Sequence, residues 1–175
     1  IRFRGAALPA PQRRKAMFYL PDGIAPWSDQ PMWRVTGLFR ELYFLATDRE
    51  AEIVRRLELT PVLHKRVAEL SKGNRRRLLL ALALLTPQPI LLLDEPFDGF
   101  DLRQTLHVMD LLREVARERA LLLSIHQLKD AERICDRLLL LAAGRRLGLG
   151  TLAQLAEQSG TARADLEEVF LGITA

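Results

Sequence analysis

The order of apolar and polar positions is most regular in the C-terminal two-thirds of the chain. Short, continuous apolar runs at 90–93 and 120–125 alternate with amphipathic stretches at 73–85 and about 102–118. Runs of the first kind are typical of strands covered on both faces, and stretches of the second kind are typical of helices. Their alternation predicts a parallel sheet with crossover helices, and hence an α/β fold.

The pattern before residue 73 is different. Residues 1–5 and 15–20 have the character of short strands around a Pro- and Ala-rich loop, and 21–31 is rich in turn residues. Two helices are then expected. The first covers 36–46, and Leu38, Leu42 and Leu45 share one of its faces.

The second of these helices is expected to begin at an Asp48 N-cap and to end near Leu59. Because no strand separates the helices, residues 27–70 are predicted to form a helical subdomain. The remaining residues, 1–26 and 71–175, would form the core portion of a single, partial domain. At its C-terminal end we expect a helix at 127–135, a hairpin turning at Ala143–Gly144, and helices at 151–158 and 164–171.

Composition narrows the class of protein. The chain has 175 residues, of which 49% are hydrophobic and 27% charged, as in a globular domain with a core. The apolar runs at 78–85 and 138–143 are far shorter than the roughly 18 residues that span a bilayer. The only cysteine, Cys135, excludes an internal disulfide and favours a reducing compartment. The net charge of +4 permits nucleic-acid contact, but 75–77 fits better as a solvated helix start.

Three candidate chemical groups follow the two apolar runs. Asp94 and Glu95 end the first run, and His126 ends the second. Ligands of open α/β sheets gather at the carboxyl ends of strands, so these side chains would meet if the strands are neighbours. Asp94 would then hold Mg²⁺, Glu95 would polarise a water molecule, and His126 would bond a terminal phosphate. The alternative for the carboxylates is a cap or turn after a buried strand.

A second candidate lies at the expected start of the helix over 73–85. Ser71, Lys72, Gly73 and Asn74 combine a hydroxyl, a cation and a glycine at a helix N-terminus. Free backbone N–H groups and the helix dipole attract phosphate at such a position. Taken alone, the segment fits an ordinary N-cap at Ser71 better than a phosphate site.

Taken in order, LSKGN (70–74), ILLLDEP (90–96), DGFD (98–101) and SIH (124–126) resemble the ATP-binding cassette (ABC) ATPases. They are similar to the signature motif, Walker B, the D-loop and the switch histidine of that family. The C-terminal DLEEVFLGIT is similar to ATPases of ABC-2-type exporters. The resemblance implies a P-loop NTPase-like parallel sheet core with an α-helical subdomain.

The resemblance also implies ATP and Mg²⁺ as cofactors. Asp94 would serve Mg²⁺, Glu95 would be the general base, and His126 would stabilise the transferring phosphoryl group. Asp22 stands where the family often has a glutamine that contacts Mg²⁺ or the lytic water. Two further implied sites face a second subunit. The signature residues Ser71, Lys72, Gly73 and Asn74 would meet the γ-phosphate of ATP bound there, and Asp101 would lie at the dimer seam.

The implied partners are a second nucleotide-binding domain, as homodimer or heterodimer, and membrane permease subunits that meet residues 32–70. The implied location is cytoplasmic, at the inner face of the membrane, and no nucleic-acid partner is expected. The sequence contains no Gly-x-x-x-x-Gly-Lys-Ser/Thr, because none of its ten glycines precedes a lysine. We therefore expect a fragment that starts just after Walker A and has little activity alone.

Two alternatives stay open at this point. One is the C-terminal half of a DNA-associated ABC-type ATPase, whose halves are separated by a long coiled coil. It predicts sustained heptads before the signature motif, and residues 32–70 lack them. The other is a non-catalytic regulatory homologue. Lys72, Asn74, Asp98 and Phe100 depart from the usual residues, but the proposed base, Glu95, is retained.

Overall fold

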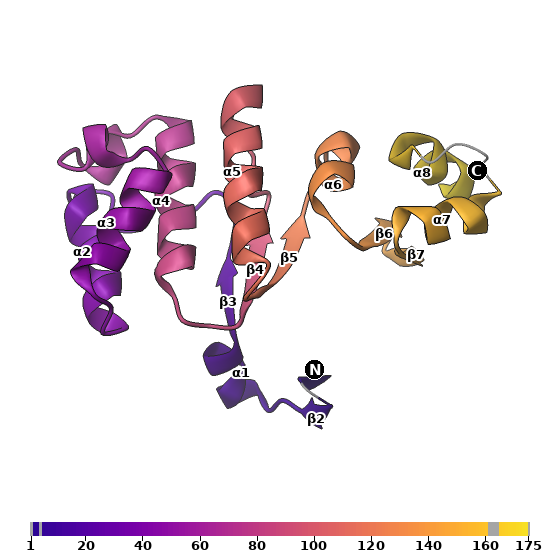
Figure 1. Ribbon diagram of the computed structural model, residues 1–175, viewed down its shortest axis with the longest axis horizontal. Helices are drawn as coiled ribbons and strands as arrows, with labels where there is room; N and C mark the ends of the chain where they lie inside the picture. Colours follow the sequence, from indigo (N-terminus) through magenta and orange to yellow (C-terminus); the bar gives the residue numbers. More distant parts are fainter. Residues whose placement is uncertain (1, 4, 161–164, 175) are drawn as a thin grey trace. The chain divides into compact units, whose positions relative to one another are not determined.

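The computed structural model describes residues 2–3, 5–160 and 165–174. Residues 1–124 and 125–175 form two compact units, and each is described by itself. The first contains a parallel sheet with helices, so the predicted α/β class is confirmed (Figure 1). The division into a core portion and a helical subdomain at 27–70 stays a prediction.

The sheet of the first unit has three parallel strands. β4 (Ile90–Asp94) lies between β3 (Met17–Leu20) and β5 (Ala120–Ser124). The register pairs Ile90 with Ala120 and Asp94 with Ser124, without a shift. The carboxyl ends of β4 and β5 are therefore level, and their last side chains stand next to each other.

The two faces of this sheet differ in exposure. Successive side chains alternate between faces, and those of Leu20, Leu91 and Leu93 are buried on one of them. On the other face, Tyr19 is 57% and Leu122 is 60% exposed. The expectation that both faces are covered is therefore wrong for the described residues. Asp94 and Ser124 have the parity of the exposed face.

The helix α4 (Lys72–Leu85) is the central helix of the first unit. It contacts β3, α2 (Met32–Leu42) and α3 (Thr47–Arg56), and all its residues from 76 to 85 are buried. Burial on every side explains its all-round apolar sequence. Arg119, directly before β5, donates a hydrogen bond to the carbonyl of Leu84 and thereby satisfies one of the last acceptors of α4. α5 (Leu102–Val115) follows β4.

The helices before α4 differ from the predicted ones. α2 begins directly after Pro31 and buries Met32, Val35 and Phe39, whereas Leu38 and Leu42 are exposed. α3 begins at Thr47 with Ala46 as N-cap, so the predicted Asp48 cap is wrong. Two short 3₁₀ helices, η1 (Thr60–Val62) and η2 (Val67–Glu69), lead to α4.

The N-terminal segment also contains a helix that the sequence pattern did not indicate. β1 (Arg2–Phe3) and β2 (Ala6–Ala7) pair in antiparallel fashion. α1 (Ala10–Ala16) covers part of the expected loop and the first two residues of the strand expected at 15–20, so β3 begins only at Met17. Pro9 and Pro11 suggested irregular backbone. They stand at the N-cap and in the first turn of α1, where proline is tolerated because its missing N–H has no helical partner.

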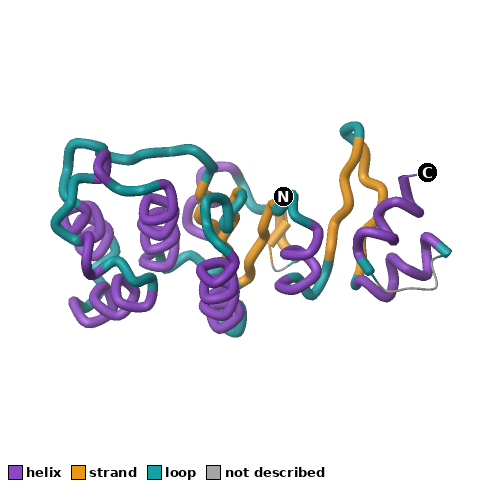
Figure 2. The backbone as a smooth tube through the Cα atoms, turned by 90° about the horizontal axis from the view of Figure 1, so that it is seen from above, coloured by secondary structure: helices purple, strands orange, loops and turns teal. Residues whose placement is uncertain are grey.

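The second unit is built on a hairpin of β6 (Leu138–Ala142) and β7 (Arg145–Gly150), preceded by α6 (Leu128–Ile134). The predicted turn is confirmed, and Ala143 and Gly144 both have positive φ, as a two-residue hairpin turn requires. Figure 2 shows the two strands side by side. α7 (Leu152–Ser159) and α8 (Leu166–Thr174) pack on β7. The predicted start of the last helix, residue 164, lies outside the described residues.

Candidate catalytic site

The Asp94 carboxylate lies at the end of β4 and is surrounded by hydrogen-bond donors. Ser124 Oγ donates to Asp94 Oδ1. On the other oxygen, Oδ2, the Tyr19 hydroxyl donates at 3.4 Å and the Asp22 backbone N–H at 3.5 Å. These donors come from β3, from the loop that follows β3 and from the end of β5, the two strands that flank β4. The parallel register is therefore what assembles this group.

The donors around Asp94 favour its ionised form. The hydrogen bond from Ser124 lowers the pKa of the Asp94 carboxyl most, and desolvation opposes it. The Asp22 amide, the Tyr19 hydroxyl and the charge of Arg76 lower the same pKa further. Desolvation, followed by the charge and hydrogen bond of Asp94, raises the pKa of the Tyr19 hydroxyl. Asp94 is thus an anion and Tyr19 a neutral donor at neutral pH.

Glu95 follows Asp94 and has a strained backbone. Its φ is +46°, in the left-handed region that costs a residue with a Cβ about 1–2 kcal/mol. The strain is offset by its backbone N–H, which donates to the Ser124 carbonyl at 3.1 Å and to Ser124 Oγ at 3.2 Å. This conformation redirects the chain sharply at the end of β4. Strained residues of this kind cluster at functional sites.

Arg76 joins three segments at the same sheet edge. Its side chain is 5% exposed, although 75–77 was expected at a solvated helix start. Nη2 forms an ion pair with Asp22 Oδ1, and Nη1 donates to the carbonyl oxygen of Asp94 at 3.3 Å. Its neighbour Arg77 is also buried and pairs with Glu58 at 2.9 Å. The expectation of solvated arginines is therefore wrong for these two residues.

The start of α4 carries the predicted phosphate-binding segment. Ser71 is its N-cap, and Ser71 Oγ accepts a hydrogen bond from the Asn74 backbone N–H at 3.2 Å. The ordinary capping role that the sequence allowed is thus present. Gly73 packs closely, because a Cβ there would lie 3.4 Å from the carbonyl oxygen of Gly99. The segments 71–74 and 98–101 therefore lie against each other.

Lys72 and Asp98 form the polar contact between these two segments. Lys72 Nζ lies 2.8 Å from Asp98 Oδ2, and the two side chains are 70% and 33% exposed. The stem of Lys72 covers Gly99, whose φ is +84°. A Cβ on Gly99 would approach Lys72 Cγ to 2.9 Å, so only glycine fits at this position without displacement.

Asp101 is the N-cap of α5. Its Oδ1 accepts from the Gln104 backbone N–H at 2.8 Å, and Gln104 Oε1 accepts from the Asp101 backbone N–H at 3.4 Å. This reciprocal pair is a capping box. Asp101 is exposed and lies in the same surface region as the 71–74 segment. Its predicted place at a dimer seam stays a prediction.

His126 belongs to the second unit, in which it precedes α6 and is exposed. Asp94 and Glu95 belong to the first unit. The predicted neighbourhood of β4 and β5 is confirmed, but the meeting of His126 with the two carboxylates stays a prediction.

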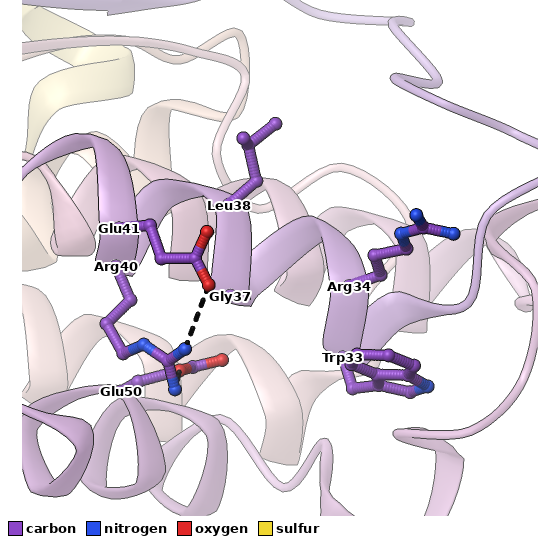
Figure 3. A pocket seen from close by; sticks show the side chains of 7 residues that line it. All are labelled: Trp33, Arg34, Gly37, Leu38, Arg40, Glu41 and Glu50. Atoms are coloured by element: carbon purple, nitrogen blue, oxygen red, sulfur yellow. Dashed lines mark hydrogen bonds and ion pairs between the residues drawn. The ribbon is translucent and has the colours of Figure 1, made fainter.

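A groove runs along the exposed side of α2 (Figure 3). It has a volume of about 460 Å³, and the close-up shows Trp33 and Arg34 at one end and Arg40 and Glu41 at the other. Glu50 of α3 is held at its floor by Arg40, at 3.2 Å. Within the described residues, none of the helices has the length and apolar character needed to cross a bilayer.

A family comparison decides the relationship. The ABC transporter family matches residues 5–98, which contain β3, the signature segment and β4. The chain belongs to the ABC transporter family. The resemblance noted in the sequence is thereby confirmed, and so is its assignment to the ATP-binding domain.

Several curated proteins resemble this ABC chain. The Nod factor export ATP-binding protein I of Rhizobium johnstonii is 41% identical over 122 residues, which is 66% of this chain and 39% of that protein. YxlF of Bacillus subtilis, an uncharacterized ABC transporter ATP-binding protein, is 35% identical over 73% of this chain and 42% of its own. A similar uncharacterized protein of Methanocaldococcus jannaschii is 28% identical over 80% and 55%. The chain thus spans about half or less of these relatives.

Solved structures agree with this family. An ATP-binding subunit of an ABC transporter matches with a TM-score of 0.84 and 27% identity, over 95% of this chain and 72% of that one. A bacterial Atm1-family ABC exporter with ATP bound matches with a TM-score of 0.74 and 20% identity, over 93% and 29%, and this similarity shows the fold alone. The P-loop NTPase-like fold class is therefore confirmed.

The Asp94 region of the ABC domain suits Mg²⁺. Its carboxylate is held ionised and partly exposed. The described residues contain no set of three or more His, Cys, Asp or Glu side chains that would enclose a metal. Mg²⁺ commonly needs no such set, because one or two carboxylates hold it together with waters and substrate phosphates. A single oriented aspartate is thus a chemically suitable ligand.

Three residues of this ABC site were not predicted as site residues. Ser124 could have been found, because strands of equal length in parallel register place it opposite Asp94. Tyr19 could have been found in the same way, from its place one residue before the end of β3. Nothing in the sequence indicated Arg76, because its partner Asp22 is 54 positions away.

Proposed function

We propose that this chain contributes the Walker B carboxylates and the signature motif to an ATP-hydrolysing domain that works as a dimer and drives a membrane transporter. The observation that supports this most is the group at the strand ends. There Asp94 is held ionised by Ser124, and Glu95 follows in a strained, redirected conformation. The names of the relatives, which include an export ATP-binding protein, support the transport role.

In this proposal Asp94 holds Mg²⁺, and Ser124 and Tyr19 keep its carboxylate ionised and oriented. When bound, Mg²⁺ would neutralise charge on the oxygens of the β- and γ-phosphates. Glu95 accepts a proton from the attacking water, because its carboxylate follows directly on the oriented one. His126 would donate a hydrogen bond to the transferring phosphoryl group. The resemblance offers Asp22 as a second metal contact, but its carboxylate is paired with Arg76.

The start of α4 is proposed to bind the γ-phosphate of ATP held by a second subunit. Ser71 is its N-cap, and Gly73 and Asn74 lie in its first turn, where backbone N–H groups and the helix dipole favour an anion. Lys72 adds a cation whose side chain is 70% exposed. Asp101 lies in the neighbouring exposed segment, as a residue at the seam between two subunits would.

The proposed membrane partner is a permease that docks on residues 32–70. Exposed apolar side chains gather there, namely Trp33 (48%), Leu38 (44%), Leu42 (59%) and Phe44 (95%). The groove of Figure 3 adds two arginines and two glutamates at its rim and floor. An amphipathic helix of a permease would fit such a surface. This partner implies a location at the cytoplasmic face of a membrane.

The test of catalysis joins a segment with a Gly-x-x-x-x-Gly-Lys-Ser/Thr loop, taken from an ABC ATP-binding subunit, ahead of this chain. The chimera should hydrolyse ATP in a Mg²⁺-dependent manner. Glu95→Gln should lower the rate at least about 100-fold and keep ATP binding, because it removes the base and preserves shape. The matched control is Glu118→Gln, an exposed glutamate in the turn between α5 and β5.

Two results would count against the proposal. Full activity in the Glu95→Gln chimera would exclude Glu95 as the base. A chimera that binds ATP and does not hydrolyse it would favour the regulatory alternative. The DNA-associated alternative is disfavoured by α2 and α3, which have 11 and 10 residues and form no long coiled coil.

A further inference from the structure

Arg76 contacts two of the segments that surround the candidate metal carboxylate. Its guanidinium forms an ion pair with Asp22 Oδ1 through one nitrogen and donates to the carbonyl oxygen of Asp94 through another, at 3.3 Å. Asp22 completes the arrangement from the other side, because its backbone N–H donates to Asp94 Oδ2 at 3.5 Å. Arg76, Asp22 and Asp94 thus form a closed ring of polar contacts, which we call the Arg76 lock.

The chemistry of arginine makes this ring rigid. The guanidinium is planar and permanently charged, and its N–H groups point in fixed directions. The position of the Asp22 carboxylate is therefore set relative to the backbone of Asp94. Arg76 is 5% exposed, so its two partners must compensate for the hydration that its charge has lost. The loss of either partner leaves a buried cation that is poorly compensated.

The lock also fixes the beginning of a long loop. Asp22 is the second residue after β3, and residues 21–31 then run to α2, which carries the groove of Figure 3. The loop has turns and no regular element of its own. Asp22 ties the start of this loop to the sheet edge, through its amide to Asp94 and through its carboxylate to Arg76.

We propose that Arg76 is a positioning residue that locks Asp22, and with it the start of loop 21–31, against Asp94. The inference rests on the proposed function, in which Asp94 holds Mg²⁺. Asp22 acts through the lock and not as a metal ligand, because its Oδ1 is paired with Arg76 and its amide orients Asp94.

Hydrogen exchange of the 175-residue chain tests the lock. Arg76→Gln and Asp22→Asn should each increase the exchange rates of amides in 21–31 about tenfold, and the double variant should show no further increase. Arg76→Lys should restore part of the protection, because lysine keeps the charge and loses the fork. The control is Arg113→Gln on α5, which breaks an exposed pair with Asp110 and should leave the loop unchanged.

Two exchange patterns would overturn the lock. One is faster exchange spread evenly over α4 and β4 with no preference for 21–31, which would mean that Arg76 only stabilises the core. The other is additive effects of Arg76→Gln and Asp22→Asn, which would mean that the two side chains act independently.

A second measurement separates the lock from direct metal binding by Asp22. Mn²⁺ is titrated into the chain, and the paramagnetic broadening of the Asp94, Glu95 and Ser124 amide signals is followed by NMR. Asp94→Asn should abolish the broadening. Asp22→Asn and Arg76→Gln should weaken it equally, two- to fivefold, with no further loss in the double variant.

Loss of broadening in Asp22→Asn alone, with Arg76→Gln unaffected, would show that Asp22 is a ligand and would overturn the inference. Absence of broadening in the unsubstituted chain has a different meaning. It would count against Asp94 as the metal carboxylate, and hence against the proposed function, whereas the exchange pattern still decides the lock.

Discussion

Two charged pairs on α4 lie one turn apart and have opposite surroundings. Arg76 is 5% exposed and pairs with Asp22 at the carboxyl ends of the strands. Lys72 is 70% exposed and pairs with Asp98 at the start of the helix. The first pair joins α4 to a strand end and a loop, and the second joins two surface turns. An ion pair on α4 thus joins buried elements in one case and surface turns in the other.

The difference follows from solvent. Water screens the Lys72–Asp98 pair, so its net contribution to stability is about 0–1 kcal/mol. Arg76 has lost most of its hydration and needs its partners to compensate. We therefore expect the Arg76 side chain to keep its partners, and the exposed Lys72 side chain to be able to leave Asp98 for another anion. A lysine that can change partner suits the start of α4, which is proposed to bind a phosphate.

The largest effect is expected from removing the partner of the buried cation. Asp22→Ala removes the ion pair of Arg76 and leaves its hydrogen bond to the Asp94 carbonyl, and should lower the free energy of unfolding by about 2–3 kcal/mol. Urea unfolding followed by circular dichroism measures this. The matched control is Asp110→Ala, which breaks an exposed pair on α5 and should cost less than about 0.5 kcal/mol. Equal losses in the two variants would contradict the contrast.

A smaller loss is expected where Lys72 covers Gly99. Gly99→Ala forces a Cβ into the left-handed region, at φ +84°, and against Lys72 Cγ. The variant should lose about 1–2 kcal/mol of unfolding free energy. Adding Lys72→Gly should return part of this loss, because it removes the steric contact and not the backbone strain. A double-mutant cycle measures the two parts, and strict additivity would exclude the contact as a cause.

The local features of both regions were predictable. Ser71 before an apolar helix predicted the start of α4, and the short run at 90–93 predicted β4 and its carboxylates. The hairpin was predicted for the same reason, because Ala143 and Gly144 lie between two apolar runs. In each case neighbouring residues determine the backbone, so a short window of sequence is sufficient.

The non-local features were not predictable. Three successive arginines look solvated, and only the packing of α4 against α2, α3 and β3 buries Arg76 and Arg77. α2 offers two apolar stripes, one through Leu38 and Leu42 and one through Met32, Val35 and Phe39. Periodicity cannot choose between two stripes. Contact with α4 selects the second and leaves the first on the surface.

The stability of the region around Arg76 should depend on pH through the Asp94 carboxyl. The lowered pKa of Asp94 means that this group stabilises the fold above its ordinary pKa of 3.8, and that the contribution is lost as pH falls through the lowered value. Ser124→Ala removes the largest cause of the shift, so the pKa of Asp94 should rise toward 3.8. The pH window between the folded and the unfolded pKa of Asp94 should then narrow, so the loss of stability on acidification should become smaller. A ¹³C NMR titration of the Asp94 carboxyl checks this, and an unchanged pKa would exclude the Ser124 bond as its cause.

The smallest effect on stability is expected at the exposed pair. Lys72→Ala should change the free energy of unfolding by less than about 1 kcal/mol, because both side chains remain hydrated when separated. The coupling between Lys72→Ala and Asp98→Ala, measured by a double-mutant cycle in urea, should fall further at 1 M salt, where the Debye length is about 3 Å. A coupling above about 2 kcal/mol that persists at 1 M salt would mean that Lys72 is held as firmly as Arg76. In that case the start of α4 would have no mobile cation to offer a phosphate, and only Ser71, Gly73 and the helix terminus would remain for that role.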